Sequence, residues 1–196
     1  MRILLLALTL GLLGGCDREK LYGKSDYYDQ HIPEIPVTMP ANAPYISEQY
    51  RNDGSKQHLG IDIWAKLHTP VLAAAPGVVQ ASFYEPAYGN RIVLSHGIDD
   101  TGAERLTVYK HLKTRQVEPG TQVARGQQIG TMGATGALGM AVHLHFETLT
   151  KARIRGEEYS DPHLHWVQGV GRVTCFDPKQ VYPTSEFRTT YPVKCR

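Results

Sequence analysis

Two short segments near the middle of the chain alternate apolar side chains with side chains that can bind a metal ion. In QHLGIDIW the alternation places His58 and Asp62 on the same side of a β-strand, because successive residues of a strand point to opposite faces. In HLHFE the same pattern places His143 and His145 together. Two imidazoles two residues apart on one strand are roughly 6.5 to 7 Å apart at the backbone, so their ring tips can converge. We therefore expect sheets that carry these polar residues on one face.

A third segment, RLTVYKHL, has the same period of two. Its phase predicts Thr107, Tyr109 and His111 on one side of a strand, opposite Leu106 and Val108. A histidine from this strand can then join the two motifs described above. Polar residues that come together from three strands are hard to explain by packing, so we expect a functional site at this place.

The rest of the chain favours strands over helices. Short strand-like segments are separated by Pro-Gly, Tyr-Gly-Asn and other glycine-rich turns, and no run with a helical period is long enough to form a layer. We therefore predict an all-β fold, mainly of antiparallel sheet, with short helices around residues 151–182. One domain is expected at residues 46–150, followed by a C-terminal extension at residues 151–196.

The charge of the chain argues against a nucleic-acid partner. The formal net charge of the 196 residues is +2, and the charged residues are scattered along the sequence. A nucleic-acid-binding domain usually carries a strongly basic patch or stripe. We therefore predict that the chain does not bind nucleic acid.

The residue types in the candidate site are those of a catalytic zinc centre. They are His58, Asp62, His111, His143 and His145. Zinc takes imidazole nitrogen and carboxylate oxygen, and a catalytic site needs three protein ligands with a fourth position open to water. The sequence contains no HExxH motif to supply a glutamate base, so the histidines that do not bind the metal are left to carry protons. Magnesium or calcium would require more oxygen ligands than this set offers. We therefore predict one zinc ion per chain.

The order and spacing of these motifs resemble those of the lysostaphin/LytM-type zinc metallopeptidases, which cleave peptide bonds in bacterial peptidoglycan. The resemblance runs from about Gln57 to Glu147 and extends beyond the histidines. It includes, in order, GIDIWA, PVLAAAPGVV, YGNRIVLSHG, YKHL, PGTQVARGQQIG and GATG. The resemblance implies an enzyme that hydrolyses peptide cross-links of peptidoglycan with a zinc-activated water.

The resemblance also implies a role for each residue of the site. His58, Asp62 and His145 would be the zinc ligands, and His111 and His143 would be the catalytic pair that does not bind the metal. Two other functions share this fold: a catalytically silent regulator that activates separate cell-wall amidases, and a wall-opening component of a secretion or surface assembly. Because all five positions hold the expected residue, the sequence favours the enzyme over the regulator. The wall-opening component would use the same chemistry and stays open as an alternative.

The chain departs from the family between GATG and HLHFE. Members of the family usually carry a turn rich in Gly, Ser and Thr that ends in Gly-Pro, whereas residues 137–142 here read Ala-Leu-Gly-Met-Ala-Val. We expect the wall beside His143 to differ for this reason, which bears on the substrate subclass rather than on the chemistry. Trp64 could line the same region or simply pack.

The other histidines carry weaker signals. His31, His68 and His96 are interpreted as surface or satisfied core residues. His163 and His165 in DPHLHW repeat the HxH pattern, but no HxxxD motif accompanies them. We interpret these two as part of a packing or rim segment, with contact to substrate or metal as the alternative.

The N-terminus indicates where the protein works. A basic start, an apolar run at residues 3–13 and the sequence Leu-Gly-Gly-Cys resemble a bacterial lipoprotein signal, with an ordinary cleaved secretory peptide as the alternative. Residues 1–15 would be removed, and Cys16 would carry the lipid that anchors the protein to a membrane. Asp17 resembles the residue that retains a lipoprotein at the inner membrane, so we expect a position on the periplasmic side of the cell envelope.

The segment after the lipidated cysteine has no clear periodicity. Residues 16–45 are polar and rich in Tyr and Pro, so we predict a tether between the lipid and the domain. The stretch from Thr38 to Tyr45 could instead pack on the domain as a strap.

Three cysteines occur in the chain, and lipidation of Cys16 would leave Cys175 and Cys195 as a pair. In an oxidising compartment such a pair predicts a disulfide. Its loop closure would contribute about 3 kcal/mol to stability. Two free thiols that bind zinc are the weaker alternative, because neither has a partner at ligand spacing.

Overall fold

The computed structural model describes residues 35–54 and 57–196. The predicted signal peptide, the lipidation site Cys16, Asp17, His31 and most of the tether lie outside these residues. No helix within the described part is long and apolar enough to cross a membrane.

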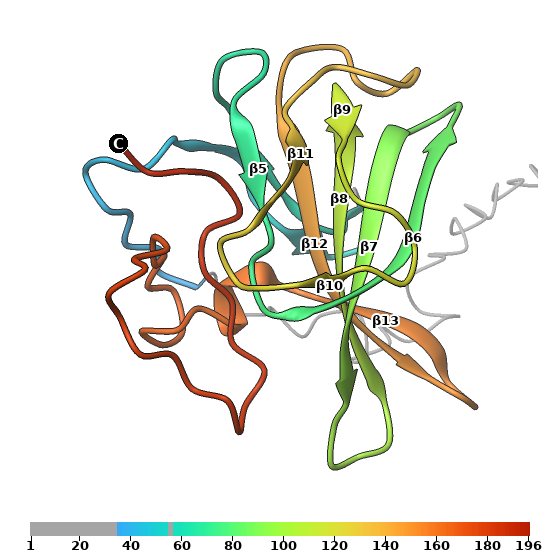
Figure 1. Cartoon of the computed structure of the whole chain (residues 1–196), viewed down its shortest axis with the longest axis vertical. Helices are drawn as coiled ribbons and strands as arrows, with labels where there is room; N and C mark the ends of the chain where they lie inside the picture. The colour runs from blue at the N-terminus through green and yellow to red at the C-terminus, as the bar shows by residue number, and fades with distance from the viewer. Residues whose placement is uncertain (1–34, 55–56) are drawn as a thin grey trace, which may run out of the picture. The chain divides into compact units, whose positions relative to one another are not determined.

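The fold is built almost entirely from antiparallel strands, which confirms the predicted class (Figure 1). The strands are β1 (Ile46–Glu48), β2 (Arg51–Asn52), β3 (Gln57–His58), β4 (Ile61–Ile63), β5 (Pro70–Leu72), β6 (Gly77–Glu85), β7 (Gly89–Ile98), β8 (Glu104–Leu112), β9 (Thr114–Arg115), β10 (Gln122–Val123), β11 (Gln128–Thr131), β12 (Leu144–Ala152) and β13 (Gly156–Ser160). The helical content of the described residues is one 3₁₀ turn, η1 (Pro162–Leu164).

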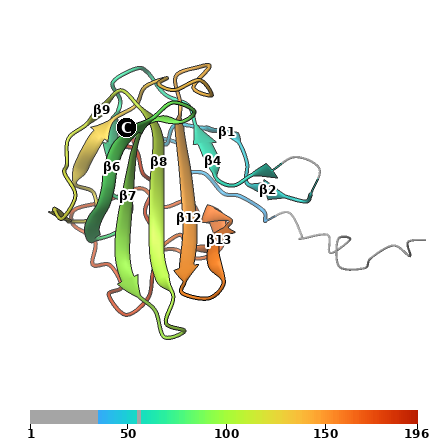
Figure 2. The same ribbon diagram turned by 90° about the vertical axis from the view of Figure 1, so that its right-hand side faces the viewer.

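Within residues 35–54 and 57–196, the strands form one large sheet and two small ones. The large sheet has the order β1-β4-β12-β8-β7-β6-β10, and β13 pairs with β12 (Figure 2). The small sheets have the orders β5-β11-β9 and β2-β3. Strand β12 is central to the site because β4 pairs with its first residues on one edge, while β8 runs along the other.

The register of β12 brings two of the sequence motifs together. His145 is directly opposite Asp62 of β4 on one side and Lys110 of β8 on the other. Residues that are paired in this way point to the same face of the sheet. The neighbouring Leu144 and Phe146 are fully buried on the opposite face. The predicted alternation of HLHFE is therefore confirmed.

The predicted phase of RLTVYKHL is wrong at its end. Tyr109 is fully buried in the main core, and its hydroxyl accepts a hydrogen bond of 2.9 Å from the backbone N–H of Ala74. Strand β8 then contains a β-bulge, in which Lys110 and His111 together oppose the single residue Arg91 of β7. The extra residue breaks the period of two and allows His111 to leave the core face.

The bulge is visible in the backbone of His111. Its φ angle is 62°, in the left-handed region that costs a non-glycine residue about 1 kcal/mol. Its N–H donates a 3.0 Å hydrogen bond to the carbonyl of Tyr88, which helps to hold this conformation. A strained residue of this kind is characteristic of functional sites.

The main core combines the large sheet with the small sheet of β5, β11 and β9. Ile61 and Phe146 come from the large sheet, and Val71 and Ile129 from the small one; all four are fully buried. Burying each such side chain contributes about 1.5 to 3 kcal/mol. The core thus packs against the face of the large sheet that does not carry Asp62 and His145.

Residues after the sheet complete this core. Trp166, Tyr191 and Val193 are fully buried in it, and the ring of Trp166 stacks near Phe146 with centroids 6.5 Å apart. The domain boundary predicted at residue 150 falls inside β12. The C-terminal residues therefore belong to the same packed unit as the sheet.

Residues 35–45 also pack on this unit. Val37, Met39 and Ala43 contact the core, and the N–H of Thr38 donates a 2.8 Å hydrogen bond to the carbonyl of Gly171. Of the two interpretations of Thr38 to Tyr45, these contacts fit the strap.

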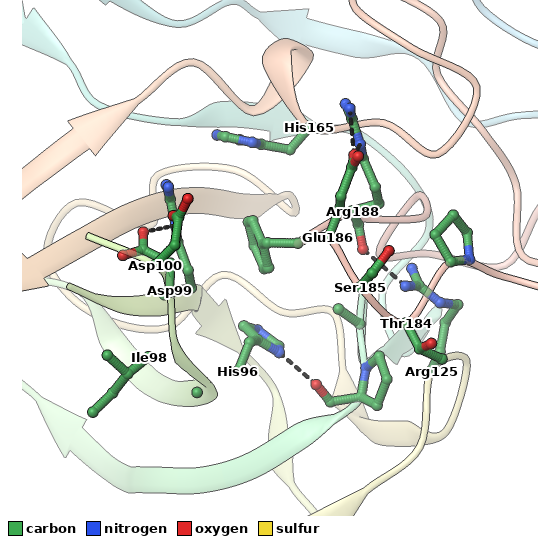
Figure 3. A pocket seen from close by; sticks show the side chains of 16 residues that line it. His96, Ile98, Asp99, Asp100, Arg125, His165, Thr184, Ser185, Glu186 and Arg188 are labelled. Carbon is green, nitrogen blue, oxygen red and sulfur yellow. Dashed lines mark hydrogen bonds and ion pairs between the residues drawn. The ribbon is translucent and has the colours of Figure 1, made fainter. Parts of the chain in front are cut away.

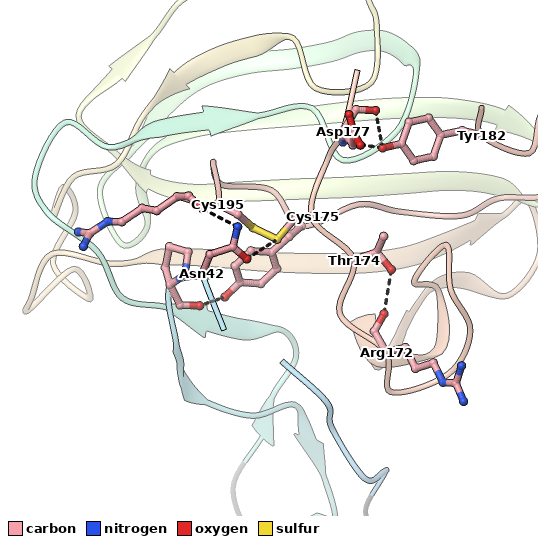
Figure 4. The surroundings of a disulfide bond; sticks show 10 residues. Asn42, Arg172, Thr174, Cys175, Asp177, Tyr182 and Cys195 are labelled. Carbon is pink, nitrogen blue, oxygen red and sulfur yellow. Dashed lines mark hydrogen bonds between the residues drawn. A yellow bond between two sulfur atoms is a disulfide. The ribbon is translucent and has the colours of Figure 1, made fainter. Parts of the chain in front are cut away.

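A disulfide joins Cys175 to Cys195 (Figure 4). Close to it, the backbone N–H of Arg196 donates a 2.9 Å hydrogen bond to the carbonyl of Asn42, and the Asn42 amide donates one of 2.5 Å to the Arg196 carbonyl. The disulfide and these bonds hold the C-terminal end of the chain against residues of the N-terminal strap.

Replacing both Cys175 and Cys195 by serine is expected to lower the free energy of unfolding by about 3 kcal/mol, because the unfolded chain regains the freedom of the closed loop. Urea denaturation of the variant and of the parent chain, with and without reductant, measures this difference. Equal stabilities for the reduced and oxidised parent would contradict it.

Candidate metal centre

Three side chains converge where β3, β4 and β12 meet. Oδ1 of Asp62 is 2.7 Å from Nδ1 of His145 and 3.2 Å from Nε2 of His58, and the two ring nitrogens are 3.2 Å apart. One ligand atom from each residue lies within 4.8 Å of the other two, so a single ion can contact all three. The structure thus groups the three residues expected to bind zinc.

The far nitrogen of each histidine ring is held by an acceptor. Nδ1 of His58 donates to the carbonyl of Gln49 at 2.8 Å, and Nε2 of His145 donates to Oε1 of Glu147 at 3.1 Å. Each bond keeps the proton on the nitrogen that faces away from the site. The lone pairs of His58 Nε2 and His145 Nδ1 are then directed at the position of the ion, as in other metal sites with carboxylate-bound or carbonyl-bound imidazoles.

The electrostatics of the cluster favour a cation. Burial alone would raise the pKa of Asp62, but the hydrogen bonds that it accepts from His145 and His58 whenever either ring takes up a second proton outweigh this effect and hold the pKa well below its usual range. Burial would likewise lower the pKa of His145, yet Asp62 and Glu147 stabilise its doubly protonated ring and raise the pKa. A field that attracts a proton to this ring also attracts a metal ion. The donor set of two imidazoles and one carboxylate fits zinc.

A buried ion pair between Lys110 and Glu147 supports the ring of His145. Nζ of Lys110 is 2.5 Å from Oε1 of Glu147, and the two side chains are only 7% and 2% exposed. Burial opposes ionisation of Glu147, but its contacts with His145 and Lys110 lower its pKa and keep it an acceptor. Lys110 also lies 4.0 Å from the centre of the Tyr88 ring. The pair therefore fixes which His145 nitrogen carries the proton.

His111 and His143 lie beside the three ligand residues. The two rings are 4.6 Å apart between centroids, and Nε2 of His143 is 3.7 Å from Oδ2 of Asp62. Nδ1 of His111 donates to the carbonyl of Thr135 at 2.9 Å, and Nδ1 of His143 donates to that of Ala141 at 2.8 Å. Each ring therefore keeps Nε2 for proton exchange. Burial, opposed by the Thr135 bond, lowers the pKa of His111 to about 4.

Two glycine turns build the wall that holds His111. Gly89 and Gly136 have φ angles of 69° and 85°, and their backbones pack against each other so closely that a Cβ on Gly136 would lie 2.2 Å from the Gly89 nitrogen. Thr135 links the turns, since its hydroxyl donates to the Leu112 carbonyl and accepts from the Asn90 N–H. The YGN and GATG motifs thus form one support for the His111 ring.

Sequence reasoning missed the residues that support the site. Gln49, Lys110 and Glu147 contact the candidate ligands or their partners, and none was predicted to have this role. Glu147 had one usable signal, because it lies in phase with His143 and His145 on the same strand face. The contact of Gln49 with His58 depends on tertiary structure and leaves no local pattern.

Trp64 and part of the apolar linker at residues 137–142 line a pocket. This pocket of about 530 Å³ is lined by Trp64 to Leu67, by Ala141 and Val142, and by Arg196. Trp64 is 50% exposed, and its ring meets that of Tyr45 edge to face. Met140 in the linker is 94% exposed. The linker that departs from the family sequence therefore supplies Ala141 and Val142 to this pocket, directly before His143 in the chain.

The other histidines do not join the centre. His68 is exposed in a turn. His163 is buried, and its ring is hydrogen-bonded to the side chain of Gln49. His96 and His165 line a separate pocket of about 670 Å³ (Figure 3). Its strand residues come from the end of β7 and the start of β8, at the opposite end of β8 from Lys110. Burial lowers the pKa of both histidines to about 4, so they are neutral near pH 7.

Residues 56–162 match Peptidase family M23, and the match covers more than half of the chain. The chain belongs to this family of metallopeptidases. Peptidoglycan DD-endopeptidase ShyC of Vibrio cholerae is 40% identical over 94 residues, which are 48% of this chain and 20% of ShyC. Glycyl-glycine endopeptidase ALE-1 of Staphylococcus capitis is 36% identical over 138 residues, which are 68% of this chain and 36% of that protein.

A solved structure shows the same architecture. The solution structure of lysostaphin, a peptidase of Staphylococcus simulans, superposes with a TM-score of 0.53 at 27% identity, covering 74% of this chain and 58% of lysostaphin. This agrees with the predicted LytM/lysostaphin-like fold. The chain spans well under half of the two curated relatives, so the likeness concerns the M23 domain.

Gly60 tests how tightly the centre is packed. A Cβ at this position would lie 2.5 Å from the Phe146 carbonyl and 2.9 Å from His145 Nε2, so backbone or ring atoms of β12 would have to shift. We expect Gly60→Ala to weaken zinc binding at least about tenfold, as displaced ligand-orienting contacts do. Competition with a chromophoric chelator measures the zinc affinity.

Gly102→Ala is the matched control for this variant. Its φ of 78° also makes alanine unfavourable, but nothing lies within 4 Å of the added atom. Zinc affinity should therefore stay at the parent value in Gly102→Ala. Equal affinities for both variants and the parent would show that the packing around Gly60 does not hold the site.

Proposed function

We propose that the chain is a zinc metalloendopeptidase that hydrolyses peptide cross-links of bacterial peptidoglycan. The observation that carries this proposal is the grouping of His58, Asp62 and His145 around one point, with His111 and His143 beside it. Membership of Peptidase family M23 and similarity to a named peptidoglycan DD-endopeptidase support the reaction class.

Each residue has a distinct part in the proposed reaction. His58, Asp62 and His145 would hold the zinc ion, which when bound polarises a carbonyl and makes a water molecule more acidic. His111 and His143 would accept the proton from the attacking water through Nε2 and deliver it to the leaving amine. Their Nδ1–H groups are tied to backbone carbonyls, so both rings are already oriented for this transfer.

The bond that we favour is the direct cross-link from D-alanine to diaminopimelate. The N-terminal sequence predicts a lipoprotein of a two-membrane cell, where such cross-links are the available substrate, and ShyC is named a DD-endopeptidase. The glycine bridge is the alternative, and ALE-1 is named for that bond. The products of digestion distinguish the two bonds.

Digestion of cross-linked peptidoglycan by the purified chain, with and without a chelator, tests the activity. We expect cross-linked dimers to become monomers in a reaction that the chelator abolishes, with the cleaved bond identified by mass spectrometry. His145→Ala should lose both zinc and activity. His111→Ala should keep its zinc and lose activity by about a hundredfold or more, because only proton transfer is removed.

The same digestion, repeated with a purified amidase present, addresses the alternative of a silent regulator. A zinc-loaded chain that leaves peptidoglycan intact but stimulates a purified amidase would overturn the proposed reaction. Loss of zinc in His111→Ala would make that residue a ligand and contradict its proposed role.

We also propose that Cys16 anchors the protein on the periplasmic side of a membrane. The apolar run and the Leu-Gly-Gly-Cys sequence support this position. Cells labelled with palmitate are expected to yield labelled protein in the membrane fraction for the parent and unlabelled protein for Cys16→Ala. Label that persists in the variant, or a parent protein without label, would contradict the anchor.

A further inference from the structure

His163 is buried but is not a member of the metal centre. It is 2% exposed, and it lies in η1, within the DPHLHW segment that has no part in the reaction proposed above. Its backbone is fixed on both sides, because its N–H donates to the Asp161 carboxylate at 2.9 Å and its carbonyl accepts from the Gly171 N–H at 2.8 Å. The ring therefore extends from a rigid support.

Both ring nitrogens of His163 are engaged, and the direction of their hydrogen bonds is determined. Nδ1 is 2.9 Å from the indole nitrogen of Trp166, which can only donate, so Nδ1 must accept. A neutral ring then carries its proton on Nε2 and donates a hydrogen bond to Oε1 of Gln49 at 2.8 Å. Burial lowers the pKa of His163 to about 4, which keeps this neutral tautomer near pH 7.

Gln49 connects this ring to the metal centre. Its side chain accepts from His163, and its backbone carbonyl accepts from Nδ1 of His58 at 2.8 Å. Gln49 is an exposed residue in the link between β1 and β2, outside both strands. The His163 bond therefore restrains a residue whose carbonyl sets the orientation of a ligand ring.

We propose that His163 is a positioning residue for the metal ligand His58, acting through Gln49. The chain of donors runs from Trp166 to His163 to the Gln49 side chain, and the Gln49 carbonyl holds the proton of His58 on Nδ1. The Nε2 lone pair of His58 is thereby aimed at Asp62 and His145. This inference rests on the proposed zinc function. It adds to the metal centre a residue that lies far along the chain from the HxxxD motif of His58 and Asp62.

The inference is tested by the zinc affinity of the full chain in four single variants and one double variant. Gln49→Leu removes the side-chain acceptor and leaves the carbonyl in place, and His163→Phe removes the donor while keeping a ring. We expect both to bind zinc about tenfold more weakly than the parent, at the low end of the loss typical for groups that orient metal ligands. His163→Gln, whose amide can still donate to Gln49, should restore the affinity.

His165→Phe is the matched control. His165 is two residues further along the chain, burial also lowers its pKa to about 4, and its Nε2 bonds to Ser160 Oγ at 2.9 Å without contacting Gln49. Its zinc affinity should equal that of the parent. A general loss of C-terminal packing would weaken zinc binding in His165→Phe as well, and that outcome would overturn the positioning role.

A second readout reports the geometry of the ligands rather than stability. The absorption spectrum of the cobalt-loaded chain should change in Gln49→Leu and His163→Phe and stay unchanged in His165→Phe. The double variant Gln49→Leu/His163→Phe should bind zinc no more weakly than either single variant, because both changes remove the same hydrogen bond. Additive losses of zinc affinity in the double variant, or parent-like affinity and spectrum in Gln49→Leu, would overturn the proposal. Because Gln49 is exposed, Gln49→Leu is expected to fold like the parent.

Failure of the proposed function is distinguishable from failure of this inference. A parent chain that binds zinc but does not cut peptidoglycan overturns the proposed reaction, while the order of zinc affinities still decides the role of His163. A parent chain that binds no zinc overturns both.

Discussion

The site depends on the pairing of β12 with its two neighbours. His145 lies directly between Asp62 and Lys110 in the sheet, so the backbone ladder itself sets the distance between the two ligand side chains. A shift of one residue would turn His145 into the core and Phe146 to the site, which the full burial of Phe146 forbids. The hydrophobic core thus holds the metal centre in register, although it lies on the other face of the sheet.

The polar contacts around the centre share one physical role. Backbone carbonyls of Gln49, Thr135 and Ala141 and the carboxylate of Glu147 each accept a hydrogen bond from the far side of a histidine ring. Every ring of the site then has a defined tautomer and a free nitrogen that faces inward. These bonds form one polar network, in which Glu147 uses Oε1 for both His145 and Lys110 while its buried Oε2 has no hydrogen-bond partner. The C-terminal residues contribute to it through Trp166 and His163.

Much of the fold and the site follows from the sequence, but not all of it. The period-2 pattern of HLHFE predicts a strand with the correct faces. The single strand predicted for HLGID is divided in the structure between β3 and β4, which belong to different sheets. The resemblance names five histidine and aspartate positions that the structure groups together. The bulge at Lys110 and His111 could not be predicted, because an extra residue in a strand leaves no trace in its own alternation. The packing of Trp166 and Tyr191 in the core was also missed, since the C-terminal residues form few strands and show no period. Contacts such as that of Gln49 with His163, 114 positions apart, exist only in the folded chain.

The most direct test of this account is the location of the ion in crystals of the zinc-loaded chain, from anomalous diffraction at the zinc edge. The account predicts one ion about 2.0 to 2.2 Å from His58 Nε2, His145 Nδ1 and an oxygen of Asp62, with His111 and His143 outside bonding distance. An ion bound by His111 or His143, or located away from β12, would contradict it.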